Sequence, residues 1–127
     1  MQNEYEKIPK RVYEDPHEQI KFLREVFDKK GYIRVRIRKR GKKKSKIRNL
    51  RLVDKNIKFI RNVQYFLKKQ GIKSVVYRIG NHFCLDIEGK GRLEMFLKII
   101  GFSNEKKLKE MQEALKPLSL SRNEQTV

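Results

Sequence analysis

Arginine recurs at every second position in the segment that follows Gly31, at Arg34, Arg36, Arg38 and Arg40. In a β-strand, residues two apart lie on one face about 7 Å from each other, so these guanidinium groups repel one another unless an anion compensates them. An antiparallel β-ribbon fits the major groove of a duplex, where arginine can donate two hydrogen bonds to guanine or to a phosphate. The spacing therefore predicts a face that binds a polyanion.

Further basic and polar residues extend this face. The turn GKKKSK at 41–46 predicts phosphate contacts, although a lysine-rich tip can also serve to prevent aggregation at a sheet edge. In the second hairpin, the doublet Val75-Val76 leaves open whether Tyr77 or Arg78 points outward. The predicted binding residues are Tyr32, Arg34, Arg36, Arg38, Arg40, Lys42, Lys43, Lys44, Lys46, Asn49, Arg51, Lys73, Tyr77 and Arg78.

The overall charge supports a polyanionic partner. The chain has 127 residues, enough for one domain, and 33 Lys and Arg against 15 Asp and Glu give a formal net charge of +18. A heat-adapted surface of ion pairs would need both signs in comparable number. Because self-repulsion opposes compaction, an excess of this size predicts a nucleic-acid partner rather than a device for solubility alone.

Metal, disulfide and membrane chemistry are not expected. The soft metal ligands are His17, His82 and Cys84; His17 falls in the first turn of a predicted helix, and His82-x-Cys84 lacks zinc spacing. We therefore expect no metal and no other cofactor. A single cysteine excludes an intrachain disulfide, and no apolar segment approaches the roughly 18 residues that cross a bilayer. The expected location is cytoplasmic, at the nucleoid if the partner is DNA.

The elements that would position these side chains follow from periodicity and capping signals. Asp15-Pro16 with Glu18 predicts a helix start at Pro16, and Gly31 ends that helix. The other expected elements are strands at 32–40 and 47–53, a helix at about 55–70, strands at 72–79 and 82–88, and helices from about 90 and from 103. This order predicts an α+β fold, a four-stranded antiparallel sheet with helices on one face and an open basic face.

The expected domain covers residues 15–117. Residues 1–14 are interpreted as an extended lead-in that rests Ile8, Val12 or Tyr13 on the domain. Residues 118–127, which follow Pro117, are interpreted as a disordered tail.

Three segments carry a resemblance to a known family. They are IPKRVYEDPHEQIKFLREVFDKKGYIRV, LVDKNIKFIRNVQYFLKKQGIKSVVYRIG and LEMFLKIIGFSNEKKLKEM. In this order, with GIKS followed by a tyrosine and with FLKIIGFS, they resemble one half of an intein-type LAGLIDADG homing endonuclease over about residues 8–116. The resemblance implies an αββαββα module with a saddle-shaped sheet that reads DNA. It implies the same outward residues that the periodicity selects, and adds Cys84 and Asp86.

The family's signature helix corresponds to Leu23–Gly31 and is degenerate. Its motif positions are Leu23, Arg24, Glu25, Asp28, Lys30 and Gly31. Where the resemblance places the metal-binding acid, this chain has Lys30, and an ammonium cannot ligate Mg²⁺. This substitution predicts a protein that binds without cleaving, which is not an enzyme and has no catalytic residue. Arg24 and Glu25 replace the small residues through which such helices pair, so a homodimer through this helix stays open.

Three hypotheses for function follow. The first is a catalytically inactive module that binds duplex DNA, either sequence-specifically or as an architectural factor. The second is RNA binding of the maturase type, with Tyr32 and Tyr77 as stacking groups, although the deep major groove of A-form RNA excludes a ribbon. The third is an active Mg-dependent DNA endonuclease in which Asp28 rotates into the site.

Overall fold

The structure is a computed structural model that describes residues 8–118. Its elements are α1 (Lys10–Glu14), α2 (Pro16–Lys30), β1 (Tyr32–Arg40), β2 (Lys43–Asp54), α3 (Ile57–Lys69), β3 (Val75–Ile79), β4 (His82–Glu88), α4 (Lys90–Ile99) and α5 (Glu105–Leu115). The strands form one antiparallel sheet in the order β1-β2-β4-β3. The predicted α+β fold with a four-stranded antiparallel sheet is therefore confirmed.

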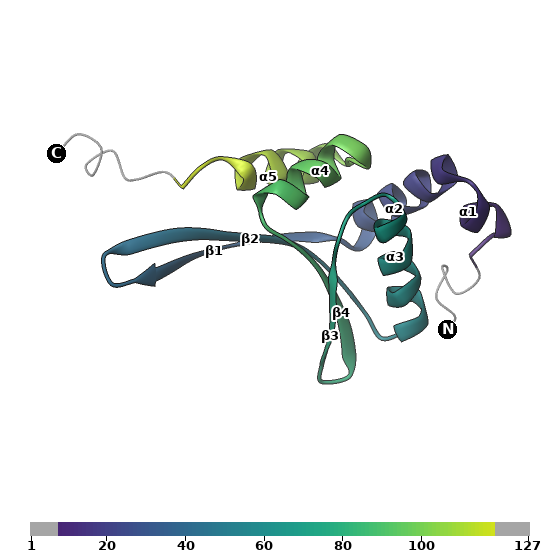
Figure 1. Ribbon diagram of the computed structural model, residues 1–127, viewed down its shortest axis with the longest axis horizontal. Coiled ribbons are helices and arrows are strands. Elements are labelled where there is room, and N and C mark those ends of the chain that lie inside the picture. The colour runs from purple at the N-terminus through teal and green to yellow at the C-terminus, as the bar shows by residue number, and fades with distance from the viewer. Residues whose placement is uncertain (1–7, 119–127) are drawn as a thin grey trace.

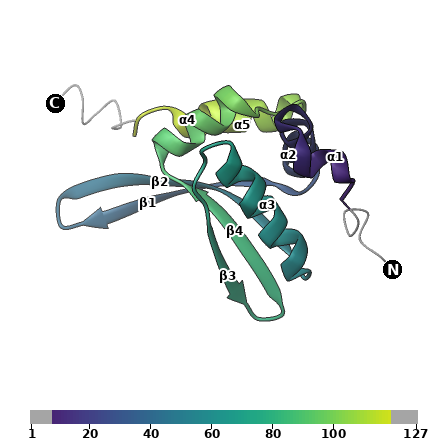
Figure 2. The same cartoon turned by 45° about the vertical axis from the view of Figure 1, so that its right-hand side comes forward.

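The two hairpins diverge from a shared centre. Figures 1 and 2 show the long β1–β2 hairpin extending in one direction and the β3–β4 hairpin in another, which gives the sheet its saddle shape. In both views α4 and α5 lie over β1–β2 and α3 lies beside β3–β4. Among the described elements, no helix lies in the angle between the free ends of the hairpins, so one face of the sheet stays open.

The core lies between the sheet and the helices. Alternate residues of the two central strands point into it and are fully buried, namely Leu50, Leu52, Leu85 and Ile87. Aromatic side chains of the helices fill the space above them, namely Phe27, Phe59, Phe66 and Phe96. Each such side chain contributes about 1.5–3 kcal/mol by leaving water, so this layer fixes which face of the sheet stays exposed.

Local signals define the helix that leads into the arginine strand. The Asp15 carboxylate accepts a hydrogen bond from the His17 amide at 2.9 Å, and Pro16 occupies the first helical position. At the other end, a Cβ on Gly31 would lie 2.8 Å from both the carbonyl oxygen and Cδ1 of Phe27. Gly31 has an ordinary φ of −72°, so its role is to provide space for β1 to leave the helix end at close range.

The lead-in expected to be extended contains a helix instead. α1 covers Lys10–Glu14 and buries Val12, which is 4% exposed, while Lys10 and Glu14 form an ion pair one turn apart at 3.7 Å. A single apolar side chain docked on the core gives this short helix an anchor that its sequence alone does not indicate. Residues 1–7 of the lead-in and 119–127 of the tail lie outside the described residues.

The first hairpin is longer than expected, because its turn is short. Gly41 has a φ of +59° and forms a tight turn with Lys42, so β2 begins at Lys43 instead of Ile47. Consequently, most of the lysine-rich segment is paired with β1 as strand. In the second hairpin, β3 begins at Val75, three residues later than expected.

Candidate nucleic-acid interface

The open face of the sheet carries the arginine row. Tyr32, Arg34 and Arg36 lie opposite Arg51, Asn49 and Ile47 of β2, and partners opposite each other point to the same face. Arg36, Arg38 and Arg40 are exposed, while Arg34 is partly exposed. The alternation predicted from the sequence is thus present in the register.

The two hairpins enclose a hollow on this face. Its volume is about 590 Å³. It is lined by Arg34, Arg36, Arg38, Ile47, Asn49, Arg51, Val75, Tyr77, Asp86 and Glu88. The β1 side of the hollow is cationic, whereas the β4 side contributes two carboxylates. The interface is therefore electrostatically asymmetric, and its positive potential concentrates on the first hairpin.

Asp86 compensates one cation of the open face from within the sheet. The Arg51 guanidinium donates to both Asp86 oxygens, at 2.8 and 3.0 Å, and the Tyr77 hydroxyl donates to Oδ2 at 2.7 Å. The Arg51 and Asp86 side chains are 14% and 4% exposed. The hydrogen bond to Asp86 raises the pKa of Arg51, and burial, followed by the same carboxylate, raises the pKa of Tyr77. Two residues of the predicted interface therefore have strong partners inside the protein.

Lys46 lies on the opposite face from the arginine row, which corrects its expected place beside the DNA. It pairs with Ile37 in the register, and its Nζ donates to the carbonyls of Glu113 and Lys116 at 3.2 and 2.8 Å. Burial, and then the charge of Arg48, lowers the pKa of Lys46. Cations at a helix C-terminus compensate its dipole, so this lysine fastens the end of α5 to β2.

Arg48 has the same role, which the sequence reasoning did not identify. Its Nε donates to the Ala114 carbonyl at 2.7 Å and its Nη2 to the Lys116 carbonyl at 3.1 Å. Lys44, opposite Lys39, shares this side of the hairpin, whereas Lys43, opposite Arg40, shares the arginine side. The lysine tip therefore divides its charges between the two faces.

In the second hairpin, the structure resolves which side chain faces outward. Tyr77 is paired with Cys84 on the open face, where the cysteine is buried at 2% exposure. Arg78 is paired with Phe83 on the other side, and its guanidinium lies 5.9 Å from the centre of that ring. Lys73 is exposed in the loop before β3.

The motif helix uses its polar residues to hold the C-terminal elements. The Asp28 carboxylate accepts from the amides of Ser103 and Asn104, at 2.9 and 3.0 Å, which directs it toward the start of α5. Arg24 Nε donates to the Ile100 carbonyl at 2.7 Å. Lys107 Nζ donates to the carbonyl oxygens of Phe27, at 3.1 Å, and of Asp28. In this arrangement Asp28 anchors the loop that precedes α5.

The other motif residues follow the expected pattern of a packed helix. Leu23 is fully buried. Glu25 lies on the outer side of α2 and forms an ion pair with Lys29 at 3.5 Å. The outer side of this helix is therefore charged, with compensation along its own length.

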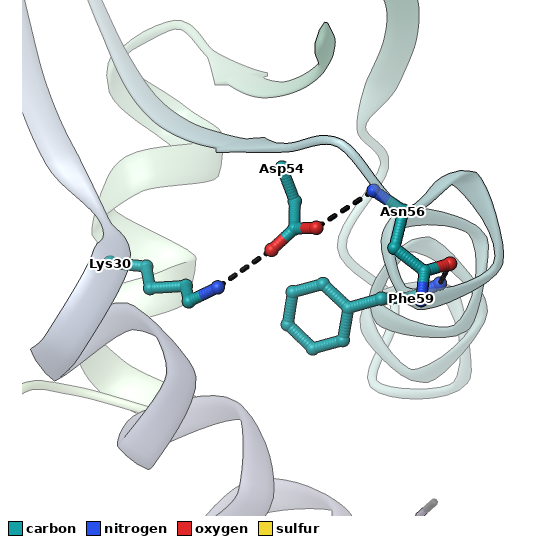
Figure 3. A network of polar contacts seen from close by, with 4 residues as sticks. All are labelled: Lys30, Asp54, Asn56 and Phe59. Atoms are coloured by element: carbon teal, nitrogen blue, oxygen red, sulfur yellow. Dashed lines mark hydrogen bonds and ion pairs between the residues drawn. The ribbon is translucent and has the colours of Figure 1, made fainter. Parts of the chain in front are cut away.

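A carboxylate from β2 lies against the ammonium at the end of the motif helix (Figure 3). Lys30 Nζ is 2.6 Å from Asp54 Oδ2, and Asp54 Oδ1 accepts from the Asn56 amide at 2.8 Å. Asn56 in turn caps α3 by accepting from the Phe59 amide at 3.2 Å. The Asp-x-Asn turn before a helix is a local sequence signal for the Asp54–Asn56 and Asn56–Phe59 contacts, but its approach to the end of α2 is a long-range contact that this signal does not indicate.

The magnesium ion that the resemblance implies does not fit these residues as they stand. Within residues 8–118, no group of three or more His, Cys, Asp and Glu side chains could hold a metal ion. At the end of α2, both oxygens of Asp54 accept hydrogen bonds from Lys30 and Asn56. The helices in the same range are also too short or too polar to cross a membrane.

Several solved structures share this fold. The chain superimposes on the homing endonuclease I-CvuI in complex with the I-CreI target with a TM-score of 0.66 and 15% identity, over 79% of this chain and 65% of I-CvuI. The homing endonuclease I-TnaI gives a TM-score of 0.59 and 18% identity, over 76% of this chain and 70% of that one. The LAGLIDADG homing endonuclease I-GzeII in complex with a DNA target gives a TM-score of 0.54 and 7% identity, over 84% of this chain and 47% of I-GzeII.

At the level of sequence, no protein-family model matches the chain and no curated protein is significantly similar to it. The resemblance inferred from the motifs is nevertheless confirmed in three dimensions, because the fold is that of the LAGLIDADG homing endonucleases. The match covers 65% of the length of I-CvuI, so the chain spans slightly less than two thirds of that protein.

The expectation that the chain is not an enzyme is contradicted by these matches. The proteins that share its fold are homing endonucleases. The expectation depended on Lys30 replacing an acid, but the structure brings the Asp54 carboxylate of β2 to that ammonium at the end of α2. The residue type at one motif position therefore does not determine what chemistry this corner contains.

Proposed function

We propose that the chain binds double-stranded DNA with the open face of its sheet and inserts the β1–β2 hairpin into the major groove. The observation that carries this proposal is the arginine row on the face without helices. Among residues 8–118, no carboxylate forms an ion pair with Arg34, Arg36, Arg38 or Arg40. Proteins of the same fold were solved in complex with DNA targets, which supports the same partner here.

Phosphate contacts would supply most of the affinity. Each phosphate that a cation neutralises lowers the slope of log affinity against log salt by about 0.9. Four arginines and the outward Lys43 therefore predict a slope of about −4 to −5. Arginines that reach base edges would add specificity, because a guanidinium matches the two acceptors of guanine.

The test is a titration of a labelled duplex at several salt concentrations, followed by selection from random duplexes. A steep salt dependence supports the proposal, and affinity that is independent of salt would contradict it. A selected motif indicates a sequence-specific regulator, whereas an unbiased pool indicates an architectural factor.

RNA binding remains the alternative partner. Tyr32 is 43% exposed on the open face and could stack on an unpaired base, whereas Tyr77 is held by Asp86. Competition of the labelled duplex with structured RNA at matched salt separates the two. If unlabelled RNA displaces the labelled duplex at a lower concentration than unlabelled duplex does, the choice of DNA is overturned.

A second candidate function is endonuclease activity, which the shared fold with homing endonucleases favours. The assay is nicking of supercoiled plasmid in the presence of Mg²⁺ or Mn²⁺. Nicking that is lost in Asp54→Asn and retained in Asp28→Asn would assign the reaction to the site where Lys30 contacts Asp54. Intact plasmid at saturating protein would leave duplex binding as the function.

We further propose that two copies pair through the outer side of α2. Glu25 and Lys29 are exposed there. A two-fold axis that passes between them would place Glu25 of each copy opposite Lys29 of the other copy. Sedimentation of the protein with a long duplex reports the stoichiometry. A complex that contains one copy at all concentrations would contradict the pairing.

A further inference from the structure

A second hollow of about 610 Å³ lies beside α3, at the loop that leads into β3. Arg61, Tyr65 and Lys68 line it from the helix, and Lys73 and Ser74 line it from the loop. Ligand sites in proteins commonly have volumes of about 300–1,000 Å³, so a nucleotide would fit. None of the residues of the arginine row lines this hollow, although Lys73 was among the residues predicted to bind DNA.

Its lining has one sign of charge. Arg61, Lys68 and Lys73 contribute three cations, and no carboxylate is among the lining residues. Arg61 Nη1 donates to Gln64 Oε1 at 3.1 Å, and Gln64 Nε2 donates to the Ser74 carbonyl at 3.3 Å, so the guanidinium is held beside the loop. A guanidinium has five N–H donors, which leaves several for an anion.

Ser74 adds a hydroxyl that lacks a partner. Its Oγ is the buried side-chain polar atom with no hydrogen-bond partner within the described part of the chain. A buried polar group in this state costs about 1–3 kcal/mol, which an accepting ligand oxygen would recover once a local shift of the loop exposes the hydroxyl to the hollow. A serine hydroxyl can rotate toward such an oxygen.

Tyr65 supplies an aromatic surface. It is 46% exposed, and contacts with Phe66, at 5.6 Å between ring centres, and with Lys69, at 5.5 Å from its ring centre, limit its movement. Bases of all types stack on such rings, because each has a π-face. An aromatic ring beside a cluster of cations is the combination that a nucleotide requires.

We propose that this hollow binds a nucleoside phosphate, with the phosphate on Arg61, Lys68, Lys73 and Ser74 and the base on Tyr65. The ligand is either a free nucleotide or an unpaired nucleotide of a strand. Because the open face binds the duplex separately, both ligands occupy the protein together.

The test uses calorimetric titration of the whole chain with AMP, adenosine and inorganic phosphate. AMP binds saturably, and adenosine binds at least about tenfold more weakly because charge-assisted hydrogen bonds to phosphate are lost. Arg61→Ala and Ser74→Ala each weaken AMP binding, whereas Tyr65→Leu weakens AMP but not inorganic phosphate. Lys98→Ala, an exposed lysine of α4, is the matched control and leaves AMP binding unchanged.

A short oligoadenylate distinguishes the two sources of the ligand. Tighter binding of the oligomer than of AMP assigns an unpaired strand, and equal affinities assign a free nucleotide. The proposal is overturned if neither binds saturably, or if binding is unchanged in Arg61→Ala and Ser74→Ala but lost in Arg36→Ala. Duplex affinity is expected to persist in Arg61→Ala, so failure at this hollow is distinguishable from failure of the open face.

Discussion

Replacing Asp86 with alanine should destabilise the fold and strengthen DNA binding at the same time. The carboxylate is 4% exposed and accepts two hydrogen bonds from Arg51 and one from Tyr77. Removing one partner of a buried ion pair costs about 3–5 kcal/mol, because the other charge stays behind without compensation. This is a large share of the 5–15 kcal/mol by which domains are typically stable.

The effect on binding has the opposite sign. Without Asp86, the Arg51 guanidinium becomes a fifth uncompensated arginine on the open face, beside Arg34 and Arg36. Duplex affinity should rise, and the salt slope should steepen by about one unit. Urea denaturation followed by circular dichroism measures the loss of stability, and duplex titrations across salt concentrations measure the slope.

Glu88→Ala is the matched control for Asp86→Ala. It removes the same charge from the same hollow. Because Glu88 is exposed, the unfolding free energy of this variant should differ from that of the parent protein by no more than about 0.5 kcal/mol. If both variants are equally stable, the Arg51–Asp86 pair does not carry the assigned energy. If Asp86→Ala leaves the salt slope unchanged, Arg51 lies outside the DNA interface.

Three further predictions test the packing, the titration and the corrected face. Gly31→Ala should cost about 1–3 kcal/mol by crowding Phe27, whereas Gly91→Ala, where a Cβ meets nothing within 4 Å, should not destabilise the protein in the same denaturation experiment. The raised pKa of Tyr77 favours its neutral form, so its contribution to stability is fully present below about pH 10 and declines as the pH rises above that value. The unfolding free energy should therefore fall less between about pH 9 and pH 11 in Tyr77→Phe than in the parent protein. Lys46→Ala should lower stability without changing the salt slope, whereas Lys43→Ala should reduce the slope by about one unit in duplex titrations.

Features set by local sequence were predictable. The period of two in β1 identified the face of the arginine row, and Asp15-Pro16 identified the start of α2. Lys46 was also within reach of sequence reasoning, because it lies an even number of residues from Leu50 and Leu52, two apolar residues of the same strand that are buried in the core. Because residues 41–46 were interpreted as a turn, Lys46 was not assigned to the strand that contains Leu50 and Leu52.

Features set by long-range register were not predictable. Arg51 and Asp86 are 35 residues apart and meet because β2 and β4 pair with one particular register. Lys30 and Asp54 are 24 residues apart and meet where the end of α2 approaches the turn before α3. No periodicity within either segment encodes such a contact.

The central claim, that the open face binds duplex DNA, is tested most directly by reversing one charge on each side of the sheet. Arg36→Glu places a carboxylate in the arginine row, and Lys98→Glu makes the same change of charge on α4, on the helix side. Fluorescence anisotropy with one duplex at moderate salt should show a loss of roughly a hundredfold in affinity for Arg36→Glu and a change of less than about threefold for Lys98→Glu. Equal losses in the two variants, or a larger loss for Lys98→Glu, would contradict the assignment.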